Sequence, residues 1–200
     1  MFKIQRLDSP VLISVQKEKS HRFANAKAIN SNHAFNWATI NGQRFNHICK
    51  PILLTMTEHH CAYCDLNDLG SGASFTIDHH RPKANHPRLS HMWVNLYPAC
   101  GNCQESKNEQ TNKQSFRPDE SIYGFINFFT MDARTGKIIA RPNLTDLNKI
   151  RVNETICFYG LNKFGRPAAR KTELKKMSTI LDGNNPHELT LNDFSYRFMW

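Results

Sequence analysis

Two Cys-x-x-Cys pairs bracket a segment that carries an acidic side chain next to an imidazole. The pairs are Cys61-Ala-Tyr-Cys64 and Cys100-Gly-Asn-Cys103. Four thiolates at this spacing suit one tetrahedral Zn²⁺ in a closed structural site. Such an ion would join two distant segments and fix both ends of the loop between them. The alternative is four free thiols, which leaves the paired spacing without a purpose.

The loop between the pairs contains Asp78 and His79, followed by Pro82. A carboxylate binds hard divalent ions such as Mg²⁺ or Mn²⁺, and histidine titrates in the range required of a general base. Hydrolysis of a phosphodiester needs a deprotonated water and stabilisation of the developing negative charge. Adjacent strand residues point to opposite faces, so Asp78 and His79 share one site only if the chain turns at Pro82. The alternative is a loop aspartate beside a hydrogen-bonded structural histidine.

Composition limits the class of protein and its surroundings. The chain has 200 residues, 40% of them hydrophobic, which suffices for one ordinary domain with a small appendage. Its formal net charge of +9 favours an anionic partner, often nucleic acid. It has no run of about 18 apolar residues and no apolar stretch after its first residues, so we expect neither a membrane span nor a secretion signal. A reducing cytoplasm, with metal-bound cysteines instead of disulfides, fits this pattern. We expect Cys49 and Cys157 to be small buried hydrophobes.

Local patterns predict a strand–loop–strand–helix unit around the cysteines. Alternating residues at 73–77 predict a short strand that delivers Asp78 and His79 to its end, and residues 93–97 predict a second strand that ends at the second cysteine pair. A short helix should begin at Cys103. A helix is also predicted over 46–56, with Pro51 capping or kinking it, in a first 55 residues that look mostly helical.

The remaining chain predicts further helices and a hairpin. Residues 125–130 and 137–140 flank a turn near Gly136 and predict a hairpin. Part of 145–159 should be helical. Residues 167–181 predict an amphipathic helix whose basic face is either solvated or in contact with phosphates; its cations are Arg170, Lys171, Lys175 and Lys176.

The histidines other than His79 have plainer interpretations. His80 is expected to be structural or to face a substrate. His86 and His91, in the loop between the two predicted strands, are expected to be solvent-exposed. His59 and His60 precede the first cysteine pair and are alternative zinc ligands, but four thiolates complete the coordination without them.

The cysteine and histidine module resembles the HNH, or ββα-metal, nuclease motif. The matching residues are Asp78-His79 on the first strand, Asn95 on the second, and the second cysteine pair leading into a helix with Lys107. The wider pattern is similar to the HNH component of Septu-type antiphage defence systems, the PtuB-like family, which also occurs with some retrons. That wider pattern adds the first cysteine pair, Trp93-Val-Asn-Leu-Tyr97, the hairpin at Thr135-Gly136, Asn153-Glu-Thr-Ile156 and Tyr159-Gly-Leu-Asn162.

The resemblance implies a fold class and roles for several residues. It implies an α+β fold in which a zinc-stapled ββα-metal core at 58–115 lies between a helical segment at 1–57 and a hairpin with helices at 116–200. It assigns Asp78 to a catalytic divalent ion and His79 to the general base, and it expects Asn95 to hold the loop that orients His79. Arg81, Lys83 and Lys107 are the expected substrate contacts.

The position that follows the second cysteine pair departs from the motif. Related motifs commonly have asparagine or histidine there as a second ligand of the catalytic ion, whereas this chain has Gln104. A glutamine carbonyl also coordinates Mg²⁺ but is one methylene longer, and Asn108, one turn later, is an alternative ligand.

Three hypotheses about function follow. The first is a metal-dependent HNH endonuclease acting on DNA. The resemblance implies that it works beside an ATPase subunit in antiphage defence. The second is a zinc-stabilised nucleic-acid-binding or adaptor protein whose HNH core is inactive, an alternative that Gln104 keeps open. The third is a homing or restriction enzyme that works alone, which would lack an ATPase encoded nearby.

Overall fold

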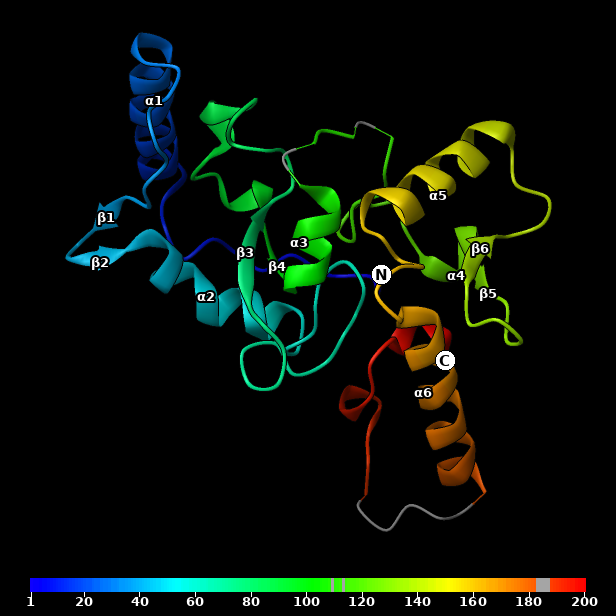
Figure 1. Ribbon diagram of the computed structural model, residues 1–200. Helices are drawn as coiled ribbons and strands as arrows, with labels where there is room; N and C mark the ends of the chain where they lie inside the picture. The colour runs from blue at the N-terminus through cyan, green and yellow to red at the C-terminus, as the bar shows by residue number, and fades with distance from the viewer. Residues whose placement is uncertain (109, 113, 183–187) are drawn as a thin grey trace.

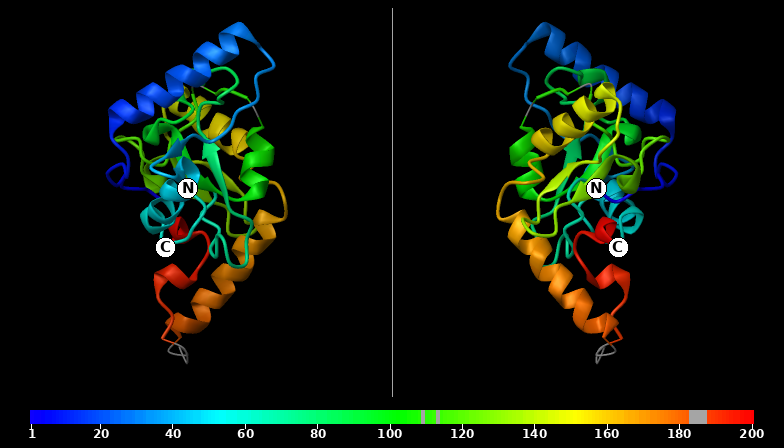
Figure 2. Two further views of the ribbon diagram at one scale, coloured as in Figure 1. Left: turned by 90° about the vertical axis from the view of Figure 1, so that its left-hand side faces the viewer. Right: turned by 90° about the vertical axis from the view of Figure 1, so that its right-hand side faces the viewer.

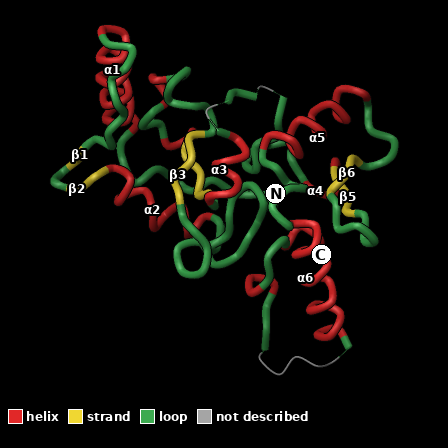
Figure 3. The backbone as a smooth tube through the Cα atoms, viewed as in Figure 1, coloured by secondary structure: helices red, strands yellow, loops and turns green. Residues whose placement is uncertain are grey.

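The computed structural model describes residues 1–108, 110–112, 114–182 and 188–200, and it is a mixed α/β arrangement of short elements (Figure 1). Within these residues, three two-stranded antiparallel sheets are formed by β1–β2, β3–β4 and β5–β6. Long loops connect them to the helices (Figure 3). The expected α+β class, with a cysteine cluster at its centre and helical flanks, is confirmed.

The centre of the molecule is the unit formed by β3 (Thr76–His79), β4 (Leu96–Ala99) and α3 (Gly101–Lys107). In the sheet Asp78 pairs with Tyr97 and His79 with Leu96. The strand predicted at 93–97 is wrong in its first half, because Trp93–Asn95 form a 3₁₀ turn and pairing begins only at Leu96. The side-chain amide of Asn95 donates to the backbone carbonyls of Arg81 and Leu89, so this residue holds the loop between the strands and is not itself part of the sheet.

The N-terminal segment contains two helices and a small hairpin. Helix α1 spans Ile13–Ile29 and α2 spans Phe45–Met56. Helix α2 is close to its expected bounds and continues through Pro51. The expectation of mostly helix misses β1 (Thr39–Ile40) and β2 (Gln43–Arg44). The residues joining them are Asn41 and Gly42, both with positive φ, and Asn-Gly is the preferred sequence of a two-residue hairpin turn.

The C-terminal segment is a second hairpin between helices. The predicted strand over 125–130 is wrong at its start, because α4 (Phe125–Phe128) is a helical turn and β5 covers only Phe129–Met131. Strand β6 (Ile138–Ala140) completes the expected hairpin, with Gly136 at a φ of +72° in the turn. Helix α5 (Asp146–Phe158) is capped by Thr145, whose hydroxyl accepts a hydrogen bond from the Asn148 backbone N–H.

Helix α6 (Arg166–Leu181) differs from the predicted basic helix in one respect. Arg170, expected on the solvated face, is fully buried, and its guanidinium donates to the Gly136 and Leu161 carbonyls. These contacts join the helix to the hairpin turn and to the α5–α6 connection, while the buried Nε of Arg170 has no hydrogen-bond partner among the described residues. Its exposed neighbours Lys171 and Lys175 remain on the surface.

The three expected segments share one hydrophobic core. The main cluster contains Met1 and Leu54 from the first segment and Tyr63 from the second, together with Phe129 and Phe198 from the third. The side views show α1 and α6 extending from opposite ends of this centre (Figure 2). Within the described part of the chain, no helix is both long and apolar enough to cross a membrane.

Candidate HNH active site and zinc centre

The four paired cysteines form a single buried cluster. Their sulfur atoms lie within 4.8 Å of one another, and all four residues are buried. A tetrahedral ion with Zn–S bonds of about 2.3 Å places its sulfurs about 3.8 Å apart, and the Cys64 and Cys100 sulfurs are 3.7 Å apart. The donor set and its spacing therefore fit the expected structural zinc, held by Cys61, Cys64, Cys100 and Cys103.

A buried arginine from α6 borders the cysteine cluster. The Arg166 guanidinium donates to the sulfur of Cys103 at 3.1 Å and that of Cys100 at 3.7 Å, and to the carbonyl of Tyr159 at 3.0 Å. Burial by itself lowers the pKa of Arg166, but the four cysteine sulfurs raise it above its usual value. A centre of four thiolates around Zn²⁺ carries two net negative charges, and Arg166 offsets one of them. No local pattern in the sequence indicates this contact.

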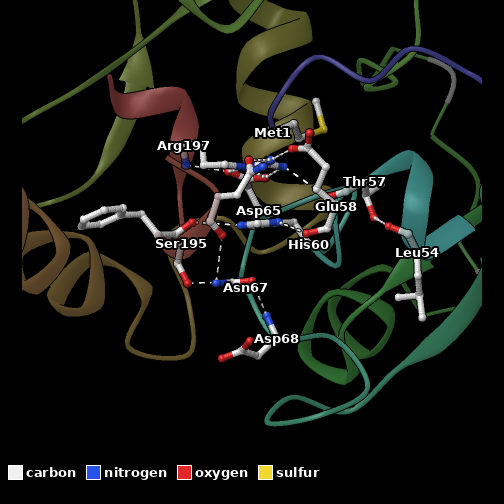
Figure 4. Close-up of polar contacts among 12 residues, drawn as sticks. Met1, Leu54, Thr57, Glu58, His60, Asp65, Asn67, Asp68, Ser195 and Arg197 are labelled. Carbon is white, nitrogen blue, oxygen red and sulfur yellow. Dashed lines mark hydrogen bonds and ion pairs between the residues drawn. The ribbon is translucent and has the colours of Figure 1, made fainter. Parts of the chain in front are cut away.

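The C-terminal segment contacts residues on both sides of the first cysteine pair, including His60 and Asp65 (Figure 4). Arg197 is ion-paired with Asp65 at 2.9 Å, with both side chains only 2% exposed, and it also pairs with Glu58. The His60 ring lies between the Glu58 and Phe194 carbonyls, at 2.6 and 2.9 Å. His60 therefore binds backbone and is not part of the cysteine cluster. These contacts join the chain's last residues to the zinc-binding turn, residues 61–65, which carries the first cysteine pair.

A pocket of about 360 Å³ lies beside β3 and α3. It is bordered on one side by the end of β3 and the loop after it, and on the other by α3. Its polar lining includes one histidine, two carboxylates, two amides and two lysines. The residues are Asp78, His79, Pro82, Lys83, Gly101, Gln104, Glu105, Lys107 and Asn108.

Asp78 is buried and held at both carboxylate oxygens. The Tyr63 hydroxyl donates to Oδ2 at 2.6 Å, and the Lys107 ammonium lies 3.1 Å from Oδ1. Lys107 also donates to the His79 carbonyl. Lys107 was expected to contact the substrate, but its side chain is 2% exposed and engaged with the site's own residues. Tyr63, which lies inside the first cysteine pair, was not anticipated in this role.

His79 lies on the other side of β3 and is anchored at one ring nitrogen. Its Nε2 is 2.8 Å from the Ser90 carbonyl, which only accepts hydrogen bonds, so Nε2 carries the proton and Nδ1 keeps its lone pair. Burial lowers the pKa of His79 to about 3; the Ser90 hydrogen bond opposes this shift, and Lys83 and Lys107 add to it. The imidazole is therefore neutral at physiological pH.

Asn95 ties together the loop that carries Ser90. Its amide accepts from the Arg81 backbone N–H at 2.7 Å and donates to the carbonyls of Arg81 and Leu89 at 3.0 and 3.2 Å. Its own carbonyl accepts from the His80 backbone N–H at 2.8 Å. The buried Asn95 side chain thus connects Arg81, two residues after His79, to Leu89, the residue before Ser90.

The other expected histidines and cations lie in several places. His80 is buried with Nδ1 3.1 Å from the Tyr159 hydroxyl, and burial lowers its pKa to about 3. His91, expected to be solvent-exposed, is only 2% exposed because α1 and the 35–38 segment cover its loop. Lys83 borders the pocket, whereas Arg81 is exposed and does not line it.

Gln104, expected as the second oxygen ligand of the catalytic ion, is one of three side chains on the α3 side of the pocket with a suitable oxygen. Gln104 and Asn108 both line the pocket, one helical turn apart, as does the exposed carboxylate of Glu105. Glu105 was not anticipated from the sequence, although its place directly after Gln104 is a visible signal. A charged carboxylate is a stronger ligand for a hard ion than either amide.

Comparison with known proteins defines the class of this site. Residues 61–110 match the HNH endonuclease family model, so the chain carries an HNH endonuclease domain over a quarter of its length. Both cysteine pairs, Asp78, His79 and Asn95 lie within the matched residues. The expected HNH resemblance is confirmed.

A particular relative shows a partial likeness. Over 65 residues the chain is 31% identical to the Septu protein PtuB of Bacillus thuringiensis. The matching stretch makes up 32% of this chain and 25% of PtuB, so the chain spans about a quarter of the length of this curated relative.

Proposed function

We propose that this chain is a metal-dependent endonuclease that hydrolyses phosphodiester bonds in DNA. The observation that carries the proposal is that Asp78 and His79, on opposite sides of β3, border one polar pocket inside the matched HNH segment. A carboxylate and a neutral imidazole at one pocket provide a ligand for a hard ion and a proton acceptor. The net charge of +9 favours a polyanionic substrate.

His79 is proposed as the general base. With Nε2–H held by the Ser90 carbonyl, Nδ1 is the nitrogen that takes the proton from the attacking water. Burial keeps the ring neutral, so it is ready to accept a proton. A phosphate in the pocket places negative charge near the ring and raises its pKa, which makes the base stronger when substrate is present.

Asp78 is proposed to hold the catalytic divalent ion, Mg²⁺ or Mn²⁺. Each oxygen of a carboxylate has two lone pairs, so the contacts with Tyr63 and Lys107 leave acceptor capacity at both. Gln104 remains the proposed second ligand, with Glu105 and Asn108 on the same side of the pocket. The bound ion supplies charge stabilisation to the phosphate and to the leaving 3′ oxygen. Asp78→Ala should abolish cleavage and leave the zinc content unchanged.

Asn95, Lys83 and Arg81 are proposed to support these two residues. The amide contacts of Asn95 support the positioning role proposed for it, since they hold the loop on which Ser90 anchors His79. Lys83 borders the pocket and is proposed to bind phosphate, with Arg81 extending the contact along the surface. Lys107 is proposed to hold Asp78 instead of the substrate.

The test is cleavage of supercoiled plasmid DNA by the purified chain with and without Mg²⁺ or Mn²⁺. His79→Ala should lose about 10²- to 10⁴-fold in rate with unchanged fold and zinc content. His80→Ala should retain more activity, and His47→Ala, on the exposed side of α2, should match the wild type. Equal losses at His79 and His80 would remove His79 from the role of base. RNA of the same sequence tests the choice of DNA.

The proposed setting is cytoplasmic antiphage defence beside an ATPase subunit. The partial likeness to PtuB, named as a Septu protein, supports it. A nuclease that shares a compartment with its own chromosome needs restraint, and a partner provides it. Co-purification with the product of a neighbouring ATPase gene tests this. Rapid cleavage by the chain alone, with no binding to such an ATPase, would favour the autonomous nuclease.

One observation favours the inactive adaptor as a second candidate. The Lys107 ammonium already provides a cation at the Asp78 carboxylate, a site where the proposed activity requires a metal ion. An adaptor would bind DNA with the same affinity in the wild type and in Asp78→Ala, and would cleave in neither.

A further inference from the structure

The ring of His79 is in contact with two aromatic side chains from outside the HNH segment. Trp37 stacks on the imidazole, with ring centroids 5.2 Å apart and planes at 16°. Phe35 meets the ring edge-on at 5.3 Å and 86°. Phe35 and Trp37 also contact each other edge-on at 5.0 Å. Both precede β1, at least 24 residues before the matched domain begins.

The segment that carries these rings is hydrogen-bonded to the loop of Ser90 and His91, the same loop that anchors His79. The Ala38 backbone N–H donates to His91 Nε2 at 3.1 Å, so the neutral His91 ring has its proton on Nδ1 and donates it to the Ser90 hydroxyl, 3.1 Å away. The Ser90 carbonyl then holds the His79 Nε2–H. The Ser20 hydroxyl of α1 accepts the His91 backbone N–H at 3.0 Å.

We infer that Phe35 and Trp37 are positioning residues for His79, so that the N-terminal segment completes the nuclease active site. The inference rests on the function proposed above. A single hydrogen bond at Nε2 leaves an imidazole free to rotate about that contact, whereas a ring stacked on one face and another at its edge fix the plane. With the ring plane fixed, the lone pair of Nδ1 points in a single direction. The isolated HNH segment lacks both rings and would hold its base with the Ser90 contact alone.

The test is the pair Trp37→Ala and Trp37→Phe in the full chain, assayed on plasmid DNA. Trp37→Ala should lower kcat by about 10²-fold, the cost of a poorly oriented catalytic group, with little change in KM. Trp37→Phe keeps an aromatic ring on the imidazole and should restore most of the rate. The matched control is Trp200→Ala, which removes a partly exposed tryptophan at the other end of the chain and should leave kcat unchanged.

Nitrogen-15 NMR of the histidine side chains provides a readout that does not depend on cleavage. In the wild type His79 should give the Nε2–H tautomer, with ring protons shifted upfield by Trp37. Trp37→Ala should remove that shift and broaden the ring signals, while Trp200→Ala should leave them unchanged. These NMR results in a protein that cleaves no DNA would support the positioning role and reject the nuclease. Wild-type kcat and unchanged His79 signals in Trp37→Ala would overturn the inference.

Discussion

Both oxygens of the Asp78 carboxylate accept hydrogen bonds from buried donors, and the two donors come from different parts of the site. Tyr63 belongs to the first cysteine pair and Lys107 to the end of α3. The Tyr63 ring also stacks on Tyr159 at 4.1 Å. The zinc-binding turn is therefore in direct contact with the carboxylate proposed to hold the catalytic ion, through the Tyr63 hydroxyl.

Tyr63→Phe should destabilise the fold while keeping the ring in place. The substitution leaves a buried carboxylate with one donor fewer, and a hydrogen bond to a charged group contributes about 1.5 to 3 kcal/mol. Urea denaturation should show that loss in the free energy of unfolding, with zinc content unchanged. Tyr159→Phe is the matched control, because its hydroxyl contacts the neutral His80 and should cost about 1 kcal/mol. Equal losses in the two variants would contradict the role given to the Asp78 charge.

Three buried histidines predict that stability falls in mild acid. Burial lowers the pKa of His79 and His80 to about 3 and that of His91 to about 4. These values lie below the value of about 6.5 in the unfolded chain, so between pH 6.5 and 4 the unfolded state binds protons that the folded state does not. Stability is complete above pH 6.5 and is lost as the pH falls, by up to about 1.4 kcal/mol per pH unit for each histidine.

The measurement is the free energy of unfolding between pH 7.5 and 5, with zinc content followed in parallel, since acid also protonates thiolates. His91→Gln removes one titrating group and should reduce the slope by about 1.4 kcal/mol per pH unit. A wild-type slope near zero in the range where zinc is retained would show that the histidines are solvated.

At the scale of elements, β3, β4 and α3 form a unit too small to stabilise itself by burial. Strands β3 and β4 are each four residues long and α3 has seven. A two-stranded hairpin is marginal in water without further packing. The cysteine cluster lies where the turn before β3, the end of β4 and the start of α3 meet, so a metal there holds all three together.

We therefore expect one tightly bound zinc ion per chain, with Cys103→Ser losing both the ion and the folded module. Structural zinc contributes on the order of 10 kcal/mol of coupled folding energy. Elemental analysis measures the number of zinc ions per chain, and circular dichroism in the presence of a chelator measures how far the fold depends on zinc. Cys157→Ser should keep both, because Cys157 is not part of the cluster and is exposed, so the expectation that it is buried is wrong. Less than half an equivalent of zinc in a folded protein would contradict the expectation.

At the scale of the whole molecule, the two ends of the chain meet at the zinc-binding turn. Arg197 lies 4.4 Å above the Phe2 ring and is ion-paired with Asp65, which follows Cys64. The C-terminal residues thus contact Asp65 at the end of the turn from which the Tyr63 hydroxyl reaches Asp78. The flanking segments therefore support the central unit through buried contacts.

Arg197→Leu should cost about 3 to 5 kcal/mol in the free energy of unfolding, because it leaves the Asp65 carboxylate buried without its partner. The double substitution Arg197→Leu with Asp65→Leu removes both charges and should recover part of that loss. Denaturant titration at fixed zinc measures both. A loss below about 1 kcal/mol in Arg197→Leu would show that Asp65 finds other partners or water.

The sequence predicted the parts of the site that share a local pattern. The cysteine pairs, the Asp78-His79 dipeptide and α2 were all recognisable because spacing and residue type carry the information within a few positions. Element boundaries were less accurate where a side chain serves a loop, as at Asn95. The Asn41-Gly42 dipeptide is itself a strong signal for a hairpin turn, and it stands in a segment that was expected to be mostly helical.

Contacts between distant segments could not be obtained in this way. Arg170 and His91 are buried, and Lys107 pairs with Asp78, because particular distant segments pack against each other. Local residue patterns do not show which distant segments will pack together. By itself, the sequence determined the chemistry available: four soft sulfur ligands, a hard carboxylate and a neutral-range base. Only the tertiary structure decided how the His79 ring is held, because the carbonyl of Ser90 and the rings of Phe35 and Trp37 reach it through packing between segments far apart in the chain.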